Sequence, residues 1–166
     1  MNMILPLLLL MAGAENAARP QAGEAARPFS LSASSGQTVK LADYLGKKTV
    51  VLAFFPKAFT GGCTKEMSAL RDSHPQFTSA EAQILGISMD SLETQKKFAE
   101  SLKLPFPLLA DTDGATAKAY GVANDAGYAN RVTFVIGKDG KVAKVLEGRE
   151  ALESAPALGA CHPAAP

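Results

Sequence analysis

The sequence predicts an α/β domain in which helices cover both faces of a central mixed β-sheet. Three apolar runs rich in Val, Leu, Ile and Phe indicate strands buried on both faces: residues 49–55, 83–88 and 132–136. Segments with helical spacing of their apolar residues separate these runs. An Asp139-Gly140 pair after the third run indicates a closing β-hairpin. Strands that alternate with helices in this way are typical of a sheet with helices on both faces.

The first elements of the domain are predicted to form an N-terminal β-hairpin. Residues 28–31 and 38–41 have the pattern of short strands, and the polar residues 34–37 between them indicate a turn. A single helical turn at residues 41–46 then ends at a glycine. The first buried strand follows it directly.

The helices are predicted to follow the buried strands. The first helix starts near Cys63 and runs to about His74, where Pro75 stops it. The second has an N-cap at Asp90-Ser91 and runs to Leu102. The remaining elements are an extended segment, a short helix and a returning strand, at residues 105–110, 115–120 and 142–146.

The N-terminus has the features of a signal peptide. Residues 3–14 are apolar but shorter than the roughly 20 residues that span a bilayer. They end in Ala-Gly-Ala before Glu15, which is a cleavage site of the A-x-A type. We therefore expect residues 1–14 to be removed and the protein to be exported, to the bacterial periplasm. Since no Lys or Arg precedes the apolar run, the alternatives are an uncleaved anchor and a misassigned start codon, the latter with a cytoplasmic protein.

The remaining terminal segments lack a clear pattern of apolar residues. Residues 15–27 are expected to be a linker, residues 28–150 the folded domain, and residues 151–166 a weakly structured tail. The chain is expected to be weakly helical from Gly148 on and disordered over residues 159–166. The tail contains Cys161, which we expect to be flexible.

Composition excludes several classes of function. The chain has 166 residues, 47% of them apolar, which is enough for one domain with a sizeable core. A net charge of +1 gives no expectation of nucleic-acid or membrane partners once the leader is cut. Two cysteines, Cys63 and Cys161, make neither a disulfide framework nor a zinc site, so no metal or cofactor is expected.

Cys63 is placed where a buried strand passes into the N-terminus of a helix. An ordinary free thiol, with a pKa near 8.5, is only a few per cent thiolate at neutral pH. A helix N-terminus typically stabilises a negative charge by about 0.3–1 kcal/mol, which is too little to ionise a thiol fully. The sequence therefore favours a reactive Cys63 assisted by a further cation or hydrogen-bond donor. The alternative is an inert core thiol.

Pro56, Thr60 and Cys63 stand in the order Pro-x-x-x-Thr-x-x-Cys, which resembles the active-site signature of peroxiredoxins, thiol peroxidases of the thioredoxin-like fold. The resemblance covers nearly all of residues 28–147 and is greatest to the peroxiredoxin Q, or bacterioferritin comigratory protein, branch. The other stretches that carry it are residues 41–47, 62–66, 70–72, 86–91, 97–100, 104–111, 117–122, 131–136 and 139–140. It implies a thioredoxin-like fold and thiol-dependent reduction of hydrogen peroxide and organic hydroperoxides, an antioxidant activity.

The resemblance also implies roles for four residues. Cys63 matches the peroxidatic cysteine, which becomes a sulfenic acid, and Arg131 matches the arginine beside it. Thr60 matches the threonine that holds the peroxide, and Pro56 the proline that shields the site. Three of these roles have a structural alternative: Thr60 as a helix N-cap, Arg131 as a surface ion-pair residue and Pro56 as the end of a strand. Glu66 and Arg71 are interpreted as helix-surface charges without a chemical role.

The sequence departs from the family near Cys63 at two positions, and the end of the chain looks shorter and less helical than expected. Ser68 stands where many relatives of this branch have a resolving cysteine, and Gly61 stands where a proline is common. Cys161 is then the remaining thiol, as a resolving residue or as an incidental one. We favour an enzyme with one active cysteine, reduced by a thioredoxin-like protein or another outside thiol. A monomer and a homodimer are both compatible with the sequence.

Two other classes of function remain as alternatives. A thiol-disulfide oxidoreductase would require a C-x-x-C motif, but Thr60 and Glu66 flank Cys63 at that spacing. A non-catalytic thioredoxin-fold binding protein would leave the combination of Thr60, Cys63 and Arg131 without a purpose.

Overall fold

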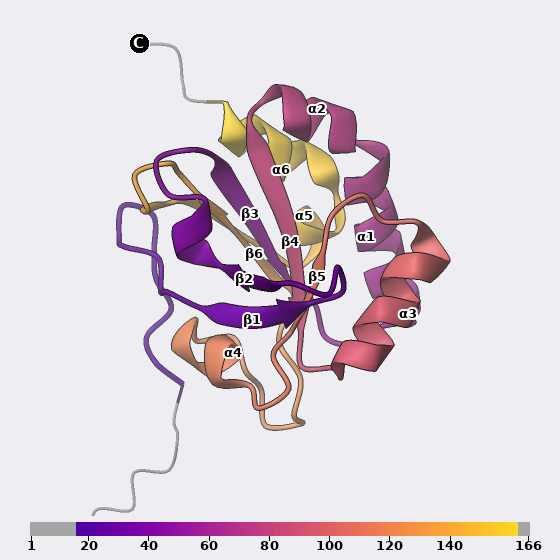
Figure 1. The fold of residues 1–166 in the computed structure, drawn as a ribbon. Coiled ribbons are helices and arrows are strands. Elements are labelled where there is room, and N and C mark those ends of the chain that lie inside the picture. Colours follow the sequence, from indigo (N-terminus) through magenta and orange to yellow (C-terminus); the bar gives the residue numbers. More distant parts are fainter. Residues whose placement is uncertain (1–15, 163–166) are drawn as a thin grey trace, which may run out of the picture.

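A computed structural model describes residues 16–162, which form a mixed β-sheet flanked by helices (Figure 1). The signal peptide predicted at residues 1–14 lies outside the described residues. The seven strands of the sheet within residues 16–162 are β1 (Ser30–Ala33), β2 (Thr38–Lys40), β3 (Thr49–Phe54), β4 (Ala82–Ser88), β5 (Leu108–Ala110), β6 (Val132–Ile136) and β7 (Val142–Glu147). Their spatial order is β2-β1-β5-β4-β3-β6-β7. The central strands β3, β4 and β5 are parallel, whereas β6 is antiparallel to β3.

Helices lie on both faces of the sheet, as the sequence predicts. They are η1 (Leu41–Asp43, a 3-10 turn), α1 (Gly61–Asp72), α2 (His74–Ser79), α3 (Leu92–Leu102), α4 (Ala115–Ala119), α5 (Arg149–Leu152) and α6 (Ser154–Cys161). Buried residues of α1, α2, α3, α5 and α6 pack in one core cluster, and those of η1 and α4 pack in the other. The N-terminal hairpin is confirmed as β1 and β2, which pair antiparallel.

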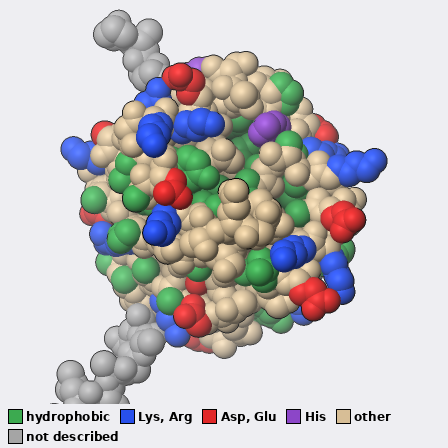
Figure 2. All heavy atoms as spheres, viewed as in Figure 1, with side chains coloured by type: hydrophobic (Ala, Val, Ile, Leu, Met, Phe, Trp, Pro, Cys, Tyr) green, Lys and Arg blue, Asp and Glu red, His purple; other side chains and the backbone are tan. Residues whose placement is uncertain are grey.

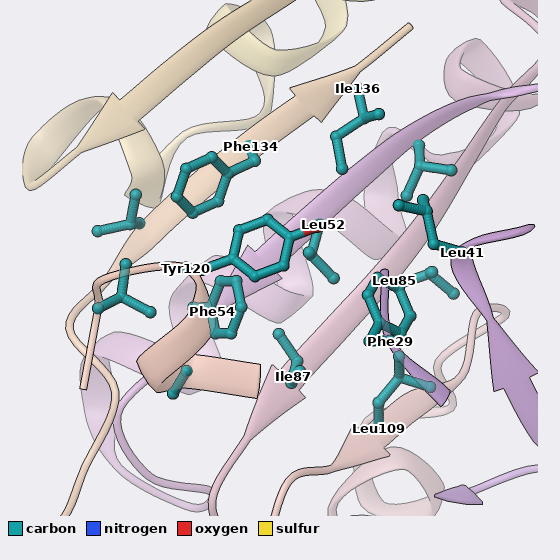
Figure 3. Packing of buried hydrophobic residues seen from close by; sticks show 14 of the residues in the cluster. Phe29, Leu41, Leu52, Phe54, Leu85, Ile87, Leu109, Tyr120, Phe134 and Ile136 are labelled. Carbon is teal, nitrogen blue, oxygen red and sulfur yellow. The ribbon is translucent and has the colours of Figure 1, made fainter. Parts of the chain in front are cut away.

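The alternation of side chains along β3 divides the core between the two faces. Leu52 and Phe54 belong to one cluster and Val51 and Ala53 to the other, because successive side chains of a strand point to opposite faces. In the first cluster, the rings of Phe54, Tyr120 and Phe134 lie with centroids 5.0–5.9 Å apart (Figure 3). This packing joins the carboxyl end of β3 to the middle of β6.

The prediction that Pro75 ends the first helix is only partly right. α1 ends at Asp72, but a separate short helix, α2, begins at His74 with Pro75 in its first turn. Proline is favoured there because its missing N–H has no partner in the first turn of a helix. α2 then buries Phe77 in the core.

The weak helical character expected from Gly148 on agrees with the structure, whereas the disordered tail expected from residue 159 is wrong over residues 159–161, which are helical. Residues 149–161 form α5 and α6, and α6 packs on β6 and β7. Ala151, Ala157 and Cys161 are buried in the cluster that includes α1. These short helices depend on tertiary packing more than on local sequence, and that is why the sequence indicates them only weakly.

The segment expected to be a linker is attached to the domain over residues 16–27. Gly23 and Glu24 exchange backbone hydrogen bonds with Val142 at the start of β7, and Arg19 forms an ion pair with Glu147 at its end. The hydroxyl of Tyr120 donates a hydrogen bond to the carbonyl of Arg27 at 2.6 Å. The folded unit therefore begins before residue 28.

The surface carries charges of both signs. On the face shown in Figure 2, basic and acidic side chains are interspersed, in keeping with the small net charge. No helix within residues 16–162 has the length and apolar character needed to cross a bilayer.

Candidate active site

Cys63 lies in the first turn of α1, as predicted, and it is fully buried. β3 ends at Phe54, a short loop turns the chain, and Thr60 occupies the N-cap position with extended backbone angles. The first turn of a helix has backbone N–H groups without helical partners, and these point toward the N-terminus. The thiol therefore lies in a positive local field that is shielded from water.

Arg131 supplies the cation that the sequence requires. Its Nη2 donates a hydrogen bond to the sulfur of Cys63 at 3.3 Å, and its side chain is 18% exposed. The pairing of β3 with β6 explains this contact, because Phe54 lies opposite Val132 and Arg131 directly precedes Val132. Two segments distant in the sequence thus meet at one end of the sheet.

The backbone of α1 leaves just enough room for this guanidinium. A Cβ atom placed on Gly62 would lie 3.0 Å from Nη2 of Arg131. The glycine before Cys63 therefore permits the close approach of Arg131 to the helix N-terminus.

Glu66 is part of the same cluster, so its interpretation as a helix-surface charge is wrong. It is 1% exposed, and Nη1 of Arg131 donates to its Oε2. The signal for this placement was its spacing, since residues three apart share a helix face and Glu66 stands three after Cys63. Arg71, by contrast, is half-buried and pairs with Asp72 beside it.

Burial controls the protonation of Glu66. It raises the pKa of Glu66 to about 8, and the charge of Arg131 opposes this only in part. Its Oε1 has no hydrogen-bond partner among the described residues. Arg131 remains a cation: burial alone would lower its pKa, but Glu66 and Cys63 raise it above the ordinary value. Arg131 is thus shared between a thiol and a carboxyl group of elevated pKa.

Thr60 and Pro56 both lie in the loop that precedes α1. The hydroxyl of Thr60 donates to the carbonyl of Lys57 at 2.7 Å, and its side chain makes no N-cap hydrogen bond. It has the backbone position of an N-cap but keeps its acceptor lone pairs, and the side chain is exposed. Pro56 is half-buried and follows Phe55 at the end of β3.

Cys161 lies far from Cys63, so the expectation of a flexible tail thiol is wrong. It is 5% exposed and lines a hollow of about 510 Å³ together with Thr49 and Gly137. Thr49 begins β3 and Gly137 follows β6, whereas Cys63 and Arg131 lie at the other ends of these strands. At ~3.3 Å per residue, the length of β3 alone corresponds to roughly 16 Å.

This separation rules out a direct disulfide between Cys63 and Cys161 in the folded chain. A disulfide requires Cα atoms about 4.4–6.8 Å apart. Burial also raises the pKa of Cys161 to about 11, which keeps that thiol protonated at neutral pH. Ser68, on α1, supplies no thiol in its place.

The cluster has the chemistry of an activated thiol. A sulfur at a helix N-terminus, with a guanidinium at hydrogen-bond distance, can attack an electrophilic atom. The remaining N–H donors can stabilise the negative charge that forms on a leaving oxygen. Within residues 16–162, His, Cys, Asp and Glu side chains form no group of three or more that could hold a metal ion.

Comparisons with known proteins agree with this chemistry. The model of the AhpC/TSA family matches residues 22–145. The chain is 41% identical over 129 residues to peroxiredoxin Bcp of Bacillus subtilis, covering 74% of this chain and 82% of that protein. It is 42% identical over 122 residues to the chloroplastic peroxiredoxin Q of Sedum lineare, covering 72% of this chain and 65% of that protein, slightly less than two thirds of its length.

Solved structures show the same fold. The peroxidoxin BcpB of Mycobacterium tuberculosis superposes with a TM-score of 0.80 at 34% identity, over 86% of this chain and 97% of that chain. A PrxQ mutant of Xylella fastidiosa gives a TM-score of 0.80 at 25% identity, over 86% of this chain and 96% of that chain. The thioredoxin-like fold expected from the sequence is thereby confirmed.

Proposed function

Because this chain belongs to the AhpC/TSA family of peroxiredoxins, we propose that it is a thiol-dependent peroxidase that reduces hydrogen peroxide and organic hydroperoxides through Cys63. The observation that carries the assignment of Cys63 is the 3.3 Å contact between its sulfur and Nη2 of Arg131, at the N-terminus of α1. The protein serves in antioxidant defence, in line with relatives named peroxiredoxin Bcp and alkyl hydroperoxide reductase E.

The reaction begins with attack of the Cys63 thiolate on one oxygen of the peroxide. The S–O bond forms as the O–O bond breaks, and the departing oxygen takes a proton to leave as water or an alcohol. Arg131 and the N–H groups of the first turn of α1 stabilise the charge on that oxygen. Thr60 holds the peroxide through its free lone pairs, and Pro56 limits access of water to the loop.

An outside thiol then reduces the sulfenic acid of Cys63. One thiol forms a mixed disulfide with Cys63 and releases water, and a second thiol frees Cys63 and leaves as a disulfide. The position of Cys161 at the opposite end of β3 supports this one-cysteine route. A thioredoxin-like protein is the reductant we propose.

The test is the intact mass of the protein after one equivalent of hydrogen peroxide without added thiol. The wild type and Cys161→Ser should each gain one oxygen at Cys63, and Cys63→Ser should gain none. A rapid loss of two hydrogens in the wild type alone would instead make Cys161 a resolving residue within the chain, and a disulfide-linked dimer lost in Cys161→Ser would make it one between chains. No change at Cys63 would favour the binding-protein alternative.

Export is the second part of the proposal. The sequence of residues 1–14 supports cleavage after Ala14 and a location in the bacterial periplasm. Expression of the full chain in a bacterium, followed by N-terminal sequencing of each cell fraction, tests it. A protein that begins at Glu15 in the periplasm agrees with export, whereas retention of Met1 in the cytoplasm contradicts it.

A further inference from the structure

The loop that precedes α1 is connected to the segment after β4 by a hydrogen bond to a half-buried carboxylate. The backbone N–H of Ala58 donates to Oδ2 of Asp90 at 2.9 Å, and the two residues lie 32 positions apart in the sequence. Ala58 is buried and Asp90 is half-buried. Asp90 thus satisfies a loop N–H that no helix or strand partner reaches.

A chain of side-chain hydrogen bonds fixes the orientation of Asp90. The hydroxyl of Ser88 donates to the same Oδ2 at 2.7 Å. Nε2 of Gln95 donates to Oγ of Ser88 and to the carbonyl of Leu109, both at 2.8 Å. Ser88 and Gln95 are fully buried. A buried network of this kind holds its members in one geometry because each lost contact leaves an unsatisfied polar group.

The next residue of the loop needs such support because of its backbone conformation. Phe59 has φ = 65°, in the left-handed region that residues with a Cβ seldom occupy. Its ring, 56% exposed, lies 5.1 Å from the ring of Phe98. Phe98 follows Gln95 by one turn of α3, which lies alongside α1 (Figure 1). A strained conformation persists only where surrounding contacts determine it.

We propose that Asp90 is a positioning residue for the peroxidase reaction. Through Ala58, its carboxylate holds residues 57–60 in place, and this sets Thr60 and the first turn of α1 around Cys63. The inference rests on the proposed function, but the anchoring of the loop can be measured without it. Small displacements in a reactive site lower rates steeply, because attack requires aligned atoms at short distance.

The experiment compares Asp90→Ala, Asp90→Asn and Asp139→Ala in the full chain. The amide oxygen of asparagine can accept the same hydrogen bonds from Ala58 and Ser88, so Asp90→Asn should preserve the anchor. Asp139 accepts a backbone hydrogen bond from Lys141 in a turn beyond β6, and its removal is a matched control. The rate of Cys63 oxidation by hydrogen peroxide is measured, together with tryptic cleavage of the Lys57–Ala58 bond.

We expect Asp90→Ala to oxidise Cys63 about 10- to 100-fold more slowly and to be cleaved several-fold faster after Lys57. Asp90→Asn and Asp139→Ala should stay within about twofold of the wild type in both measurements. The proposal is overturned if Asp90→Ala behaves as the wild type, if Asp90→Asn is as impaired as Asp90→Ala, or if Asp139→Ala is impaired equally. If the wild type itself fails to react, the proposed function fails, and cleavage after Lys57 still decides whether Asp90 anchors the loop.

Discussion

Arg131 joins Glu66 to Cys63, because one guanidinium donates Nη1 to the buried carboxyl group and Nη2 to the sulfur. The guanidinium is therefore shared between the thiol proposed to react and a buried carboxyl group of raised pKa. Below the raised pKa of Glu66 its carboxyl group is neutral and the charge of Arg131 is directed to the sulfur. Above that pKa the two carry opposite charges.

Replacement of Glu66 by glutamine should change how stability depends on pH. The pKa of Glu66 is raised from 4.5 to about 8 by burial, so the folded state retains a proton that the unfolded state loses in between. Its contribution to stability is fully present below pH ~4.5 and is lost as pH rises to ~8. In urea unfolding, the free energy of unfolding of Glu66→Gln relative to that of the wild type should therefore increase between pH 5 and pH 8, by on the order of a few kcal/mol.

The control for this prediction is Glu100→Gln, which alters an exposed carboxylate on α3. Its free energy of unfolding should follow the wild type across the same range of pH. Parallel curves for Glu66→Gln and the wild type would contradict a raised pKa.

Arg131→Lys should reduce peroxidase activity although the positive charge is kept. A lysine ammonium is a single point donor and cannot reproduce the planar fork that reaches Glu66 and Cys63 together. We expect the rate of Cys63 oxidation to fall by about 10²–10³, the usual cost of losing a donor to a developing oxyanion. Because the chain has no tryptophan whose fluorescence could report oxidation, the rate is measured by rapid quenching followed by mass spectrometry.

Arg71→Lys is the matched control for Arg131→Lys. Arg71 lies on α1, the helix that carries Cys63, and its Nη1 donates to the carbonyl of Leu102. Its replacement should leave the oxidation rate unchanged. Equal losses in both variants would point to general damage to α1 instead.

Gly62→Ala should separate stability from activity. Alanine is favoured over glycine in a helix by roughly 0.5–1 kcal/mol, so the melting temperature should rise. The added Cβ would lie 3.0 Å from Nη2 of Arg131, which must move, and oxidation of Cys63 should slow about 3- to 10-fold. Gly61→Ala, whose Cβ has nothing within 4 Å, should give similar stability without the loss of rate. Equal oxidation rates in the two variants would show that the close approach of Arg131 to Gly62 does not affect the reaction of Cys63.

Cys161→Ala should keep full peroxidase activity. Burial raises the pKa of Cys161 to about 11 and so keeps its thiol protonated, and its position near Thr49 and Gly137 places it at the opposite end of β3 from Cys63. Steady-state turnover with an outside thiol should stay within about twofold of the wild type, and unfolding should require roughly 1 kcal/mol less free energy. A large loss of turnover with intact folding would restore Cys161 as a resolving residue.

The site was predictable as far as local sequence determines it. The passage from β3 into α1 follows from the apolar pattern and the two glycines, so local sequence singles out Cys63, whereas Thr60 and Pro56 were assigned through the family resemblance. Arg131 was found through the resemblance alone, since nothing local shows that Val132 lies opposite Phe54. Glu66 was missed because a charged residue on a helix is usually solvated, and only the tertiary position of Arg131 gives it a buried partner.

The C-terminal segment is helical although its local sequence does not favour a helix. α6 contains Pro156 and Gly159, and both lower helix propensity. Its burial against β6 and β7 provides the stability that its sequence does not, and this also places Cys161. Local sequence therefore indicated only weak helix for the segment, and it gave a flexible Cys161 where the structure has a buried one.

The N-terminal segment covers part of one edge of the β-sheet. β7 is an edge strand, and an open edge offers unpaired N–H and C=O groups to another copy of the chain. Residues 23–26 pair with the start of that edge, and Arg19 binds Glu147 at its end. A chain shortened to begin at residue 28 would lose this cover, and we expect it to aggregate through β7 while its catalytic cluster stays intact.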